Sequence, residues 1–127
     1  MQKIAKSAAI AALIAAVVNA IVVLIATAIS GELLVTMPAP MTITVAEPFI
    51  FTALLGIIGS LIVSFIAMRT ANPRRTWVLI AVIGVTLYGI PPFLSAGAIT
   101  AIWFNVMHAV AAVFIIPAVA KALPESK

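Results

Sequence analysis

The sequence predicts an all-α membrane protein: an antiparallel bundle of four transmembrane helices, with a partly extended or hairpin-like outer loop between the first two helices. Composition is the first observation, because 65% of the residues are hydrophobic and 8% are charged, against roughly 25% charged in soluble domains. Length is the second, since a soluble chain of 127 residues has too little interior to bury so much apolar surface. The third is a succession of four apolar segments, each near the roughly 20 residues that cross a bilayer as a helix.

The four apolar segments make up most of a single domain spanning residues 1–127, and they lie at 4–29, 49–68, 77–94 and 98–120. The 4–29 segment follows a basic start, as in a signal peptide. Its apolar run is longer than the usual h-region of about 7–15 residues, so we expect a transmembrane helix. The short links "ANPRRT" and "PPFLSAG" indicate that neighbouring helices run antiparallel. Pro117 removes a backbone hydrogen bond within the last segment and predicts a kink there.

Residues 30–48 form the longest connection and predict a lid on the outer membrane surface. Two short runs, 33–37 and 41–45, are separated by the triplet "PAP", which is typical of a turn. In the second run threonine alternates with an aliphatic residue, which is the period of a half-buried strand. Because an isolated hairpin is weak, we expect it to pack on the helices or on another subunit. An irregular apolar loop resting among the lipid headgroups is the alternative.

The charged residues are sorted by side of the predicted membrane. The apolar segments place every basic residue on one side, and these residues are Lys3, Lys6, Arg69, Arg74, Arg75, Lys121 and Lys127. Glu32 and Glu47 fall on the other side, where there is no Lys or Arg. The positive-inside rule then predicts that both termini are cytoplasmic. The basic residues therefore indicate orientation and contact with anionic lipid, and they do not form a nucleic-acid-binding face. Trp77 and Trp103 lie near opposite interfaces, as aromatic belts do.

Two stripes of small residues predict close helix packing, because helices in lipid associate through small side chains. The members recur every four residues, and they are Ala8, Ala12, Ala16 and Ala20 in the first segment, with Gly56, Ser60 and Ser64 in the second. We expect the two helices to approach closely along these stripes, either within the fold or across a homo-oligomer.

The segment "WFNVMHAV" brings two polar side chains, Asn105 and His108, into an apolar helix. Their spacing places them on one face, which should point into the bundle. His108 lies about ten residues, or roughly 15 Å, from the outer helix end. The same depth count predicts a polar cluster, whose members are His108, Asn19, Ser60 and Thr86, with Asn105 and Tyr88 above it. Such a cluster is either a latch between helices or a functional site.

Several classes of activity lack the residues that they need. The chain has no cysteine, and its three acidic residues, Glu32, Glu47 and Glu125, lie outside the apolar segments. Proton-coupled transport through a buried carboxylate is therefore not expected. A zinc enzyme needs about three protein ligands, and the chain has one histidine. We therefore expect neither an enzyme nor a bound metal or cofactor. Haem is an alternative only through His108 of two subunits in a dimer.

Three stretches carry a resemblance to a known family: "NPRRTWVLIAVIGV", "IPPFLSAGAITA" and "NVMHAVAAVFIIPAVAKALP". Met107-His108 followed by Pro117 is the most specific part, and the loop "TMPAPMTITV" is included. The chain resembles an uncharacterised family of small four-helix bacterial membrane proteins, described as a domain of unknown function. The resemblance implies the fold and a bacterial inner-membrane location. It implies no activity.

Two hypotheses about function remain at this stage. The first is a non-enzymatic membrane protein, structural or partner-binding, which self-associates and contacts membrane lipids and other membrane proteins. The second is a pathway for a small solute or proton, or a pocket for a lipid or cofactor, centred on His108 and Asn19. A pathway needs a cavity that reaches His108, whereas a latch needs His108 packed and hydrogen-bonded.

Overall fold

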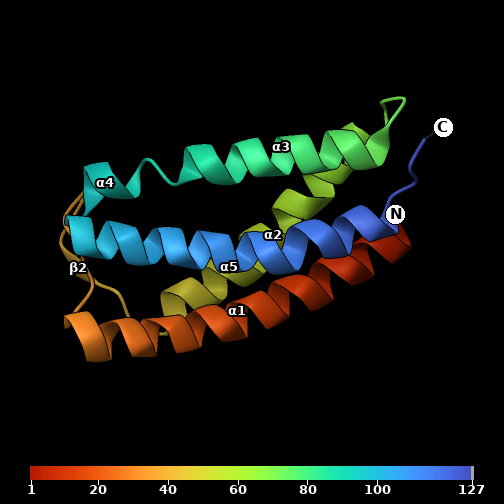
Figure 1. Ribbon diagram of the computed structural model, residues 1–127. Coiled ribbons are helices and arrows are strands. Elements are labelled where there is room, and N and C mark those ends of the chain that lie inside the picture. Colours follow the sequence, from red (N-terminus) through yellow and green to blue (C-terminus); the bar gives the residue numbers. More distant parts are fainter. Residues whose placement is uncertain (127) are drawn as a thin grey trace.

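The computed structural model describes residues 1–126 as a bundle of long helices with a small hairpin at one end (Figure 1). Its elements are, in order, α1 (Gln2–Ser30), β1 (Leu34–Val35), β2 (Met41–Thr42), α2 (Ala46–Ala67), α3 (Pro73–Tyr88), α4 (Pro92–Ser95) and α5 (Ala98–Ala122). Within these residues, four spans are long and apolar enough to cross a membrane: α1, α2, α3 together with α4, and α5. The predicted fold class is confirmed, and the spans point to a multi-pass membrane protein.

The third span differs from its prediction at both ends. Helix α3 begins at Pro73, because proline lacks the N–H that a first helical turn leaves unpaired and its fixed φ suits that position. Arg74 and Arg75 therefore belong to the helix and not to the link before it. At the other end α3 stops at Tyr88. Pro91 and Pro92 have no N–H to continue the helix, so the short α4 follows as a separate turn.

The helices are arranged with α5 between α1 and α3 (Figure 1). Helix α1 packs along both α2 and α5, whereas α3 packs mainly on α5. The main core lies toward the end where the termini meet, and it includes Ile4, Ala12, Trp77 and Val119. Helix α3 has only two buried residues, Pro73 and Trp77, and Trp77 is the one in this core. It is therefore the helix most exposed to the surroundings of the bundle.

Helices α1 and α2 come closest at Gly56. A methyl group placed on Gly56 would lie 2.9 Å from the Cβ of Ala12 and 2.9 Å from the Cδ1 of Ile115. Only glycine fits at this position without moving a neighbour. Ala8, Ala12 and Ala16 are completely buried, so the small-residue stripes form a contact between α1 and α2 inside one chain.

The hairpin-side ends of α1 and α2 do not lie at the same level. Asn19 of α1 contacts Thr52 of α2. Asn19 is eleven residues before the end of α1, but Thr52 is only six residues after the start of α2. Helix α2 therefore begins about five residues, or roughly 7 Å, below the level at which α1 ends. Figure 1 shows this difference in level between the two helix ends, which the hairpin segment connects.

The predicted hairpin between α1 and α2 is confirmed. Strands β1 and β2 are antiparallel, with Leu34 opposite Thr42 and Val35 opposite Met41. Leu33 and Ile43 flank the strands and are buried in a small second core with Ala26 of α1. This burial supplies the support that a two-stranded hairpin lacks by itself.

Further hydrogen bonds tie the hairpin to the link between α3 and α5. The Thr36 amide donates to the Ser95 carbonyl at 2.8 Å, and the Leu34 amide donates to the Thr100 hydroxyl oxygen at 3.3 Å. At the base of the hairpin, the Glu47 carboxylate accepts from the Thr44 amide at 2.8 Å and from its hydroxyl. This arrangement resembles a capping box and starts α2.

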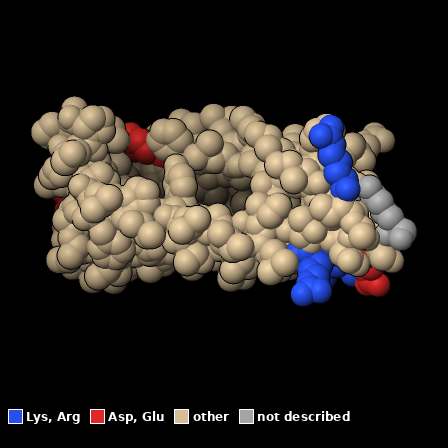
Figure 2. Space-filling model, turned by 90° about the horizontal axis from the view of Figure 1, so that it is seen from above, with Lys and Arg blue, Asp and Glu red and all other residues tan. Residues whose placement is uncertain are grey.

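Charge divides the molecule along its length, as Figure 2 shows. The basic end carries the start of α1, the connection between α2 and α3 and the end of α5, which hold Lys3, Lys6, Arg69, Arg74, Arg75 and Lys121. Lys127, the seventh predicted member, lies outside the described residues. Glu32 and Glu47 lie toward the hairpin end. Figure 2 also shows a hollow about midway along the face on which α3 lies.

Candidate functional site

Asn19 is buried in the bundle, with 1% of its surface exposed. Its Nδ2 donates to the Thr52 hydroxyl at 2.9 Å and to the Met107 carbonyl at 3.2 Å. One carboxamide thus joins α1 to both α2 and α5. Its Oδ1 is buried and accepts no hydrogen bond from the described residues. Thr52 was not predicted here, because the depth count assumed that the helices end at one level.

The predicted four-helix polar layer is wrong in two of its members. Thr86 is exposed, and its hydroxyl donates to the Val82 carbonyl of its own helix. Ser60 is buried, but it lies eight residues beyond Thr52, about 12 Å further toward the basic end. The rotation of α3 explains the error for Thr86, and the step between α1 and α2 explains the error for Ser60.

Asn105 and Tyr88 lie at the contact between α3 and α5, as does His108. The Asn105 Nδ2 donates to the Gly89 carbonyl at 3.0 Å and to the Ala101 carbonyl at 2.9 Å. A methyl group on Gly89 would lie 2.3 Å from the Asn105 Oδ1, so glycine is required for this close approach. Asn105 therefore fastens the end of α3 to α5.

His108 packs its ring edge-on against the ring of Tyr88, with 5.3 Å between centroids and 72° between planes. The Nδ1 atom is buried and has no hydrogen-bond partner among the described residues. Tyr88 itself is exposed. His108 is thus packed, as a latch requires, but it is not hydrogen-bonded as a latch should be. It is on α5 and contacts Tyr88 of α3, whereas the backbone carbonyl of the neighbouring Met107 accepts from Asn19 of α1.

The polar groups of this region therefore form two contacts rather than one cluster. Asn19 and Thr52 meet on the α1 side of α5, whereas His108, Tyr88 and Asn105 meet on the α3 side. Helix α5 thus contacts α1 through the Met107 carbonyl and α3 through the His108 and Asn105 side chains.

The predicted packing residues have different environments. Ala8, Ala12, Ala16 and Ser64 are completely buried, whereas Ala20 and Gly56 are partly buried. The Ser64 hydroxyl is buried without a partner among the described residues.

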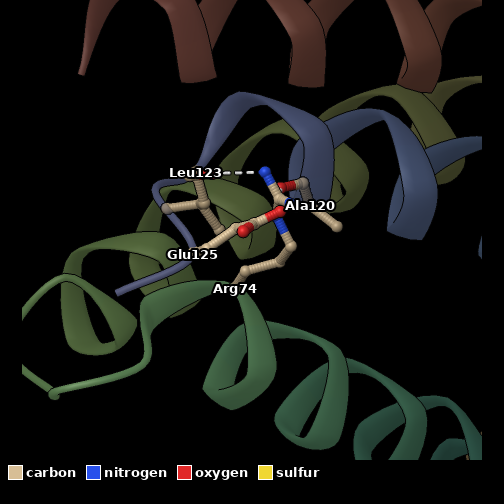
Figure 3. Close-up of polar contacts among 4 residues, drawn as sticks. All are labelled: Arg74, Ala120, Leu123 and Glu125. Atoms are coloured by element: carbon tan, nitrogen blue, oxygen red, sulfur yellow. Dashed lines mark hydrogen bonds and ion pairs between the residues drawn. The ribbon is translucent and has the colours of Figure 1, made fainter. Parts of the chain in front are cut away.

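The basic end contains a set of contacts that the sequence did not predict. The Arg74 Nε donates to the Ala120 carbonyl at 3.0 Å, and its Nη2 donates to the Leu123 carbonyl at 3.2 Å. Its Nη1 forms an ion pair with Glu125. Figure 3 shows the guanidinium of Arg74 at the end of α5, among these three partners. Arg74 thus satisfies carbonyls that the end of a helix leaves unpaired.

Trp77 also contributes to this end, but it packs inside the bundle and not on its outer surface as a residue of an aromatic belt would. The side chain is buried, with 3% exposed. Its Nε1 donates to the Ile116 carbonyl at 3.1 Å, next to Pro117 of α5. A buried indole N–H needs such a partner. Trp103 is half-buried and donates to the Ser30 hydroxyl at 2.9 Å, at the end of α1.

No three His, Asp or Glu residues within residues 1–126 lie close enough to hold a metal ion. His108 is the single histidine of the chain.

Comparison with known proteins supports the resemblance seen in the sequence. Neither the curated proteins nor the solved structures contain a significant match. A model of the family described as "Family of unknown function (DUF6069)" matches residues 1–125. The match covers nearly the whole chain, including the hairpin and all four spans. The chain therefore belongs to this family of unknown function, DUF6069.

Proposed function

We propose that this protein is a non-enzymatic membrane protein that self-associates in the bilayer through the outward face of α3. The observation that carries the proposal is the exposure of α3, which buries only Pro73 and Trp77 in its own bundle. The stripes of small residues on α1 and α2 already pack within one chain. A self-association surface must therefore lie elsewhere.

A glycine on the outward face of α3 gives this surface a specific contact point. Gly84 is exposed, and a methyl group placed on it would meet nothing within 4 Å. Glycine in a helix interior costs about 1 kcal/mol relative to alanine, and nothing in the bundle requires it here. Leu87 and Tyr88, three and four residues later, share its face and are exposed, so Gly84 forms a notch beside larger side chains. Such a notch lets a second helix approach closely in lipid.

The test is the oligomeric state of the purified protein in nanodiscs, measured by native mass spectrometry. The wild type should form a dimer, and Gly84→Leu should be monomeric with an unchanged melting temperature. Gly59→Leu is the matched control, because Gly59 on α2 also has open space around it. A wild type that stays monomeric at every protein-to-lipid ratio would refute the proposal. Equal dimerisation of the wild type and Gly84→Leu would place the contact elsewhere.

The proposal includes an orientation, with both termini in the cytoplasm and the protein in the inner membrane of a bacterium. The described basic residues at one end of the bundle support this orientation through the positive-inside rule. A cysteine introduced at Ser126 should be protected from an impermeant thiol reagent in intact cells, whereas one at Ala39 in the hairpin should be labelled. The reverse pattern would refute the orientation.

A second candidate function is a pocket for a small polar molecule beside His108. The buried Nδ1 without a partner favours it, since a buried polar atom normally has a hydrogen bond. Wild type and His108→Ala should then differ in absorbance or in the bound mass detected under native conditions, with the fold retained. A fall in melting temperature with nothing bound to either form would instead make His108 a packing residue.

A further inference from the structure

A shallow groove lies at the basic end, between the first turns of α3 and the segment that follows α5. Its volume is about 380 Å³, and its lining residues are Arg74, Arg75, Val78, Leu79 and Glu125. We propose that this groove, named the Arg75 groove, binds one anionic glycerophospholipid. The proposal does not depend on self-association through α3.

The charged and apolar residues of the lining follow each other in the same order as the parts of a phospholipid, with the charge at the membrane surface and the hydrocarbon below it. Arg74 and Val78 are four residues apart on α3, as are Arg75 and Leu79, so each guanidinium stands one turn above an aliphatic side chain on the same face. A guanidinium offers parallel N–H groups that match the oxygens of a phosphodiester. Val78 and Leu79 offer apolar surface to the start of an acyl chain.

The charge available to a ligand comes from Arg75. The Arg74 guanidinium already donates to two carbonyls of the α5 end and is paired with Glu125, whose negative charge it offsets. Arg75 is exposed and has no ion pair with any residue of the described chain. One uncompensated guanidinium matches the single negative charge of a phosphatidylglycerol-type headgroup.

The rigidity of the groove comes from contacts on its far side. The Arg74 amide donates to the Pro124 carbonyl at 3.2 Å, and Trp77 is fixed to the Ile116 carbonyl. These contacts hold the first turns of α3 against the end of α5. The groove is thus formed before a lipid enters, which lowers the ordering cost of binding.

A third arginine at this end provides a matched control. The Arg69 guanidinium lies over the Phe65 ring of α2, with Cζ 4.1 Å from the ring centroid. It lies outside the groove lining. Removing its charge changes the basic end by the same amount as removing that of Arg75, without altering the groove.

The experiment measures lipid binding to the full chain by native mass spectrometry, with phosphatidylglycerol and phosphatidylcholine of equal chain length at equal concentrations. The wild type should bind phosphatidylglycerol about tenfold more tightly than phosphatidylcholine, and Arg75→Gln should abolish that preference. Arg69→Gln should keep it. Free glycerol 3-phosphate should bind the wild type far more weakly than the lipid, because it lacks a chain to lie on Val78 and Leu79.

Three results would overturn the proposal, and two of them need only the wild type. Equal binding of the two lipids would remove the headgroup recognition. Binding of glycerol 3-phosphate as tight as that of the lipid would assign the groove to a free phosphate compound. Equal losses in Arg75→Gln and Arg69→Gln would reduce the effect to general attraction by the basic end.

Discussion

Gly56 offers the most direct test of how the bundle is packed. In Gly56→Ala the new methyl would lie 2.9 Å from the Ala12 Cβ and 2.9 Å from the Ile115 Cδ1. Ordinary contact between carbon atoms begins near 3.5 Å, so the shortfall is roughly 0.6 Å. The Ile115 side chain can rotate away, but the Ala12 Cβ is fixed to its backbone. Helix α1 must therefore move as a body.

The expected cost of this movement is about 1–3 kcal/mol, the usual range for an overpacked core. Alanine in place of glycine also stabilises a helix by about 1 kcal/mol, which offsets part of the cost. Gly59→Ala isolates the difference, because Gly59 is three residues away on the same helix and has nothing within 4 Å of a new methyl. Gly59→Ala should be neutral or slightly stabilising.

The assay is equilibrium unfolding in mixed micelles with increasing fractions of dodecyl sulphate, followed by circular dichroism. The free energy of unfolding should be lower in Gly56→Ala than in Gly59→Ala by about 1–3 kcal/mol. Equal free energies in the two variants would refute the close contact between α1 and α2. A loss in Gly59→Ala alone would place the close contact at Gly59 and not at Gly56.

Three further predictions use the same unfolding assay. Asn19→Ala should lower the free energy of unfolding by about 1 kcal/mol, because it removes two hydrogen bonds between helices that average about 0.6 kcal/mol each. Thr52→Val should reproduce about half of that loss. No change in either variant would contradict the hydrogen bond between Asn19 and Thr52. Trp77→Phe should cost about 1 kcal/mol through the lost bond to the Ile116 carbonyl, and an unchanged midpoint would place the indole N–H in another contact. Glu47→Ala should cost about 0.5–1 kcal/mol by removing the cap at the start of α2, with helical content as the second readout.

The sequence was sufficient for the features that depend on length and composition. The four spans follow from runs of apolar residues, and the hairpin follows from two short β-like runs separated by "PAP", the second with period-two alternation. The two stripes that contain Ala12 and Gly56 predicted a close helix contact, although only the structure shows that this contact lies inside one chain. These features depend on local patterns, which a single sequence carries in full.

Side-chain partners depended on two quantities that the sequence does not contain, the level of each helix and its rotation. Asn19 was singled out because a carboxamide in an apolar helix needs a partner, but its partner Thr52 lies at a level that counting from helix ends did not give. Thr86 was placed at the right depth and on the wrong face. Arg74 and Trp77 donate to backbone carbonyls of α5. Every residue has a backbone carbonyl, so the sequence does not indicate which one accepts a hydrogen bond.

The Asn19 contact has a consequence for how the protein is made. Asn19 donates to the Met107 carbonyl, 88 residues later in the chain, so α1 has both of these partners only after α5 has been made. Until α5 enters the membrane, the Asn19 amide has Thr52 as its remaining partner, and the side of α1 that will face α5 is open to lipid. Chains that stop before α5 should therefore be poor at holding α1 and α2 in place and good substrates for membrane proteases. Insertion of α5 is the step that completes the contacts of α1.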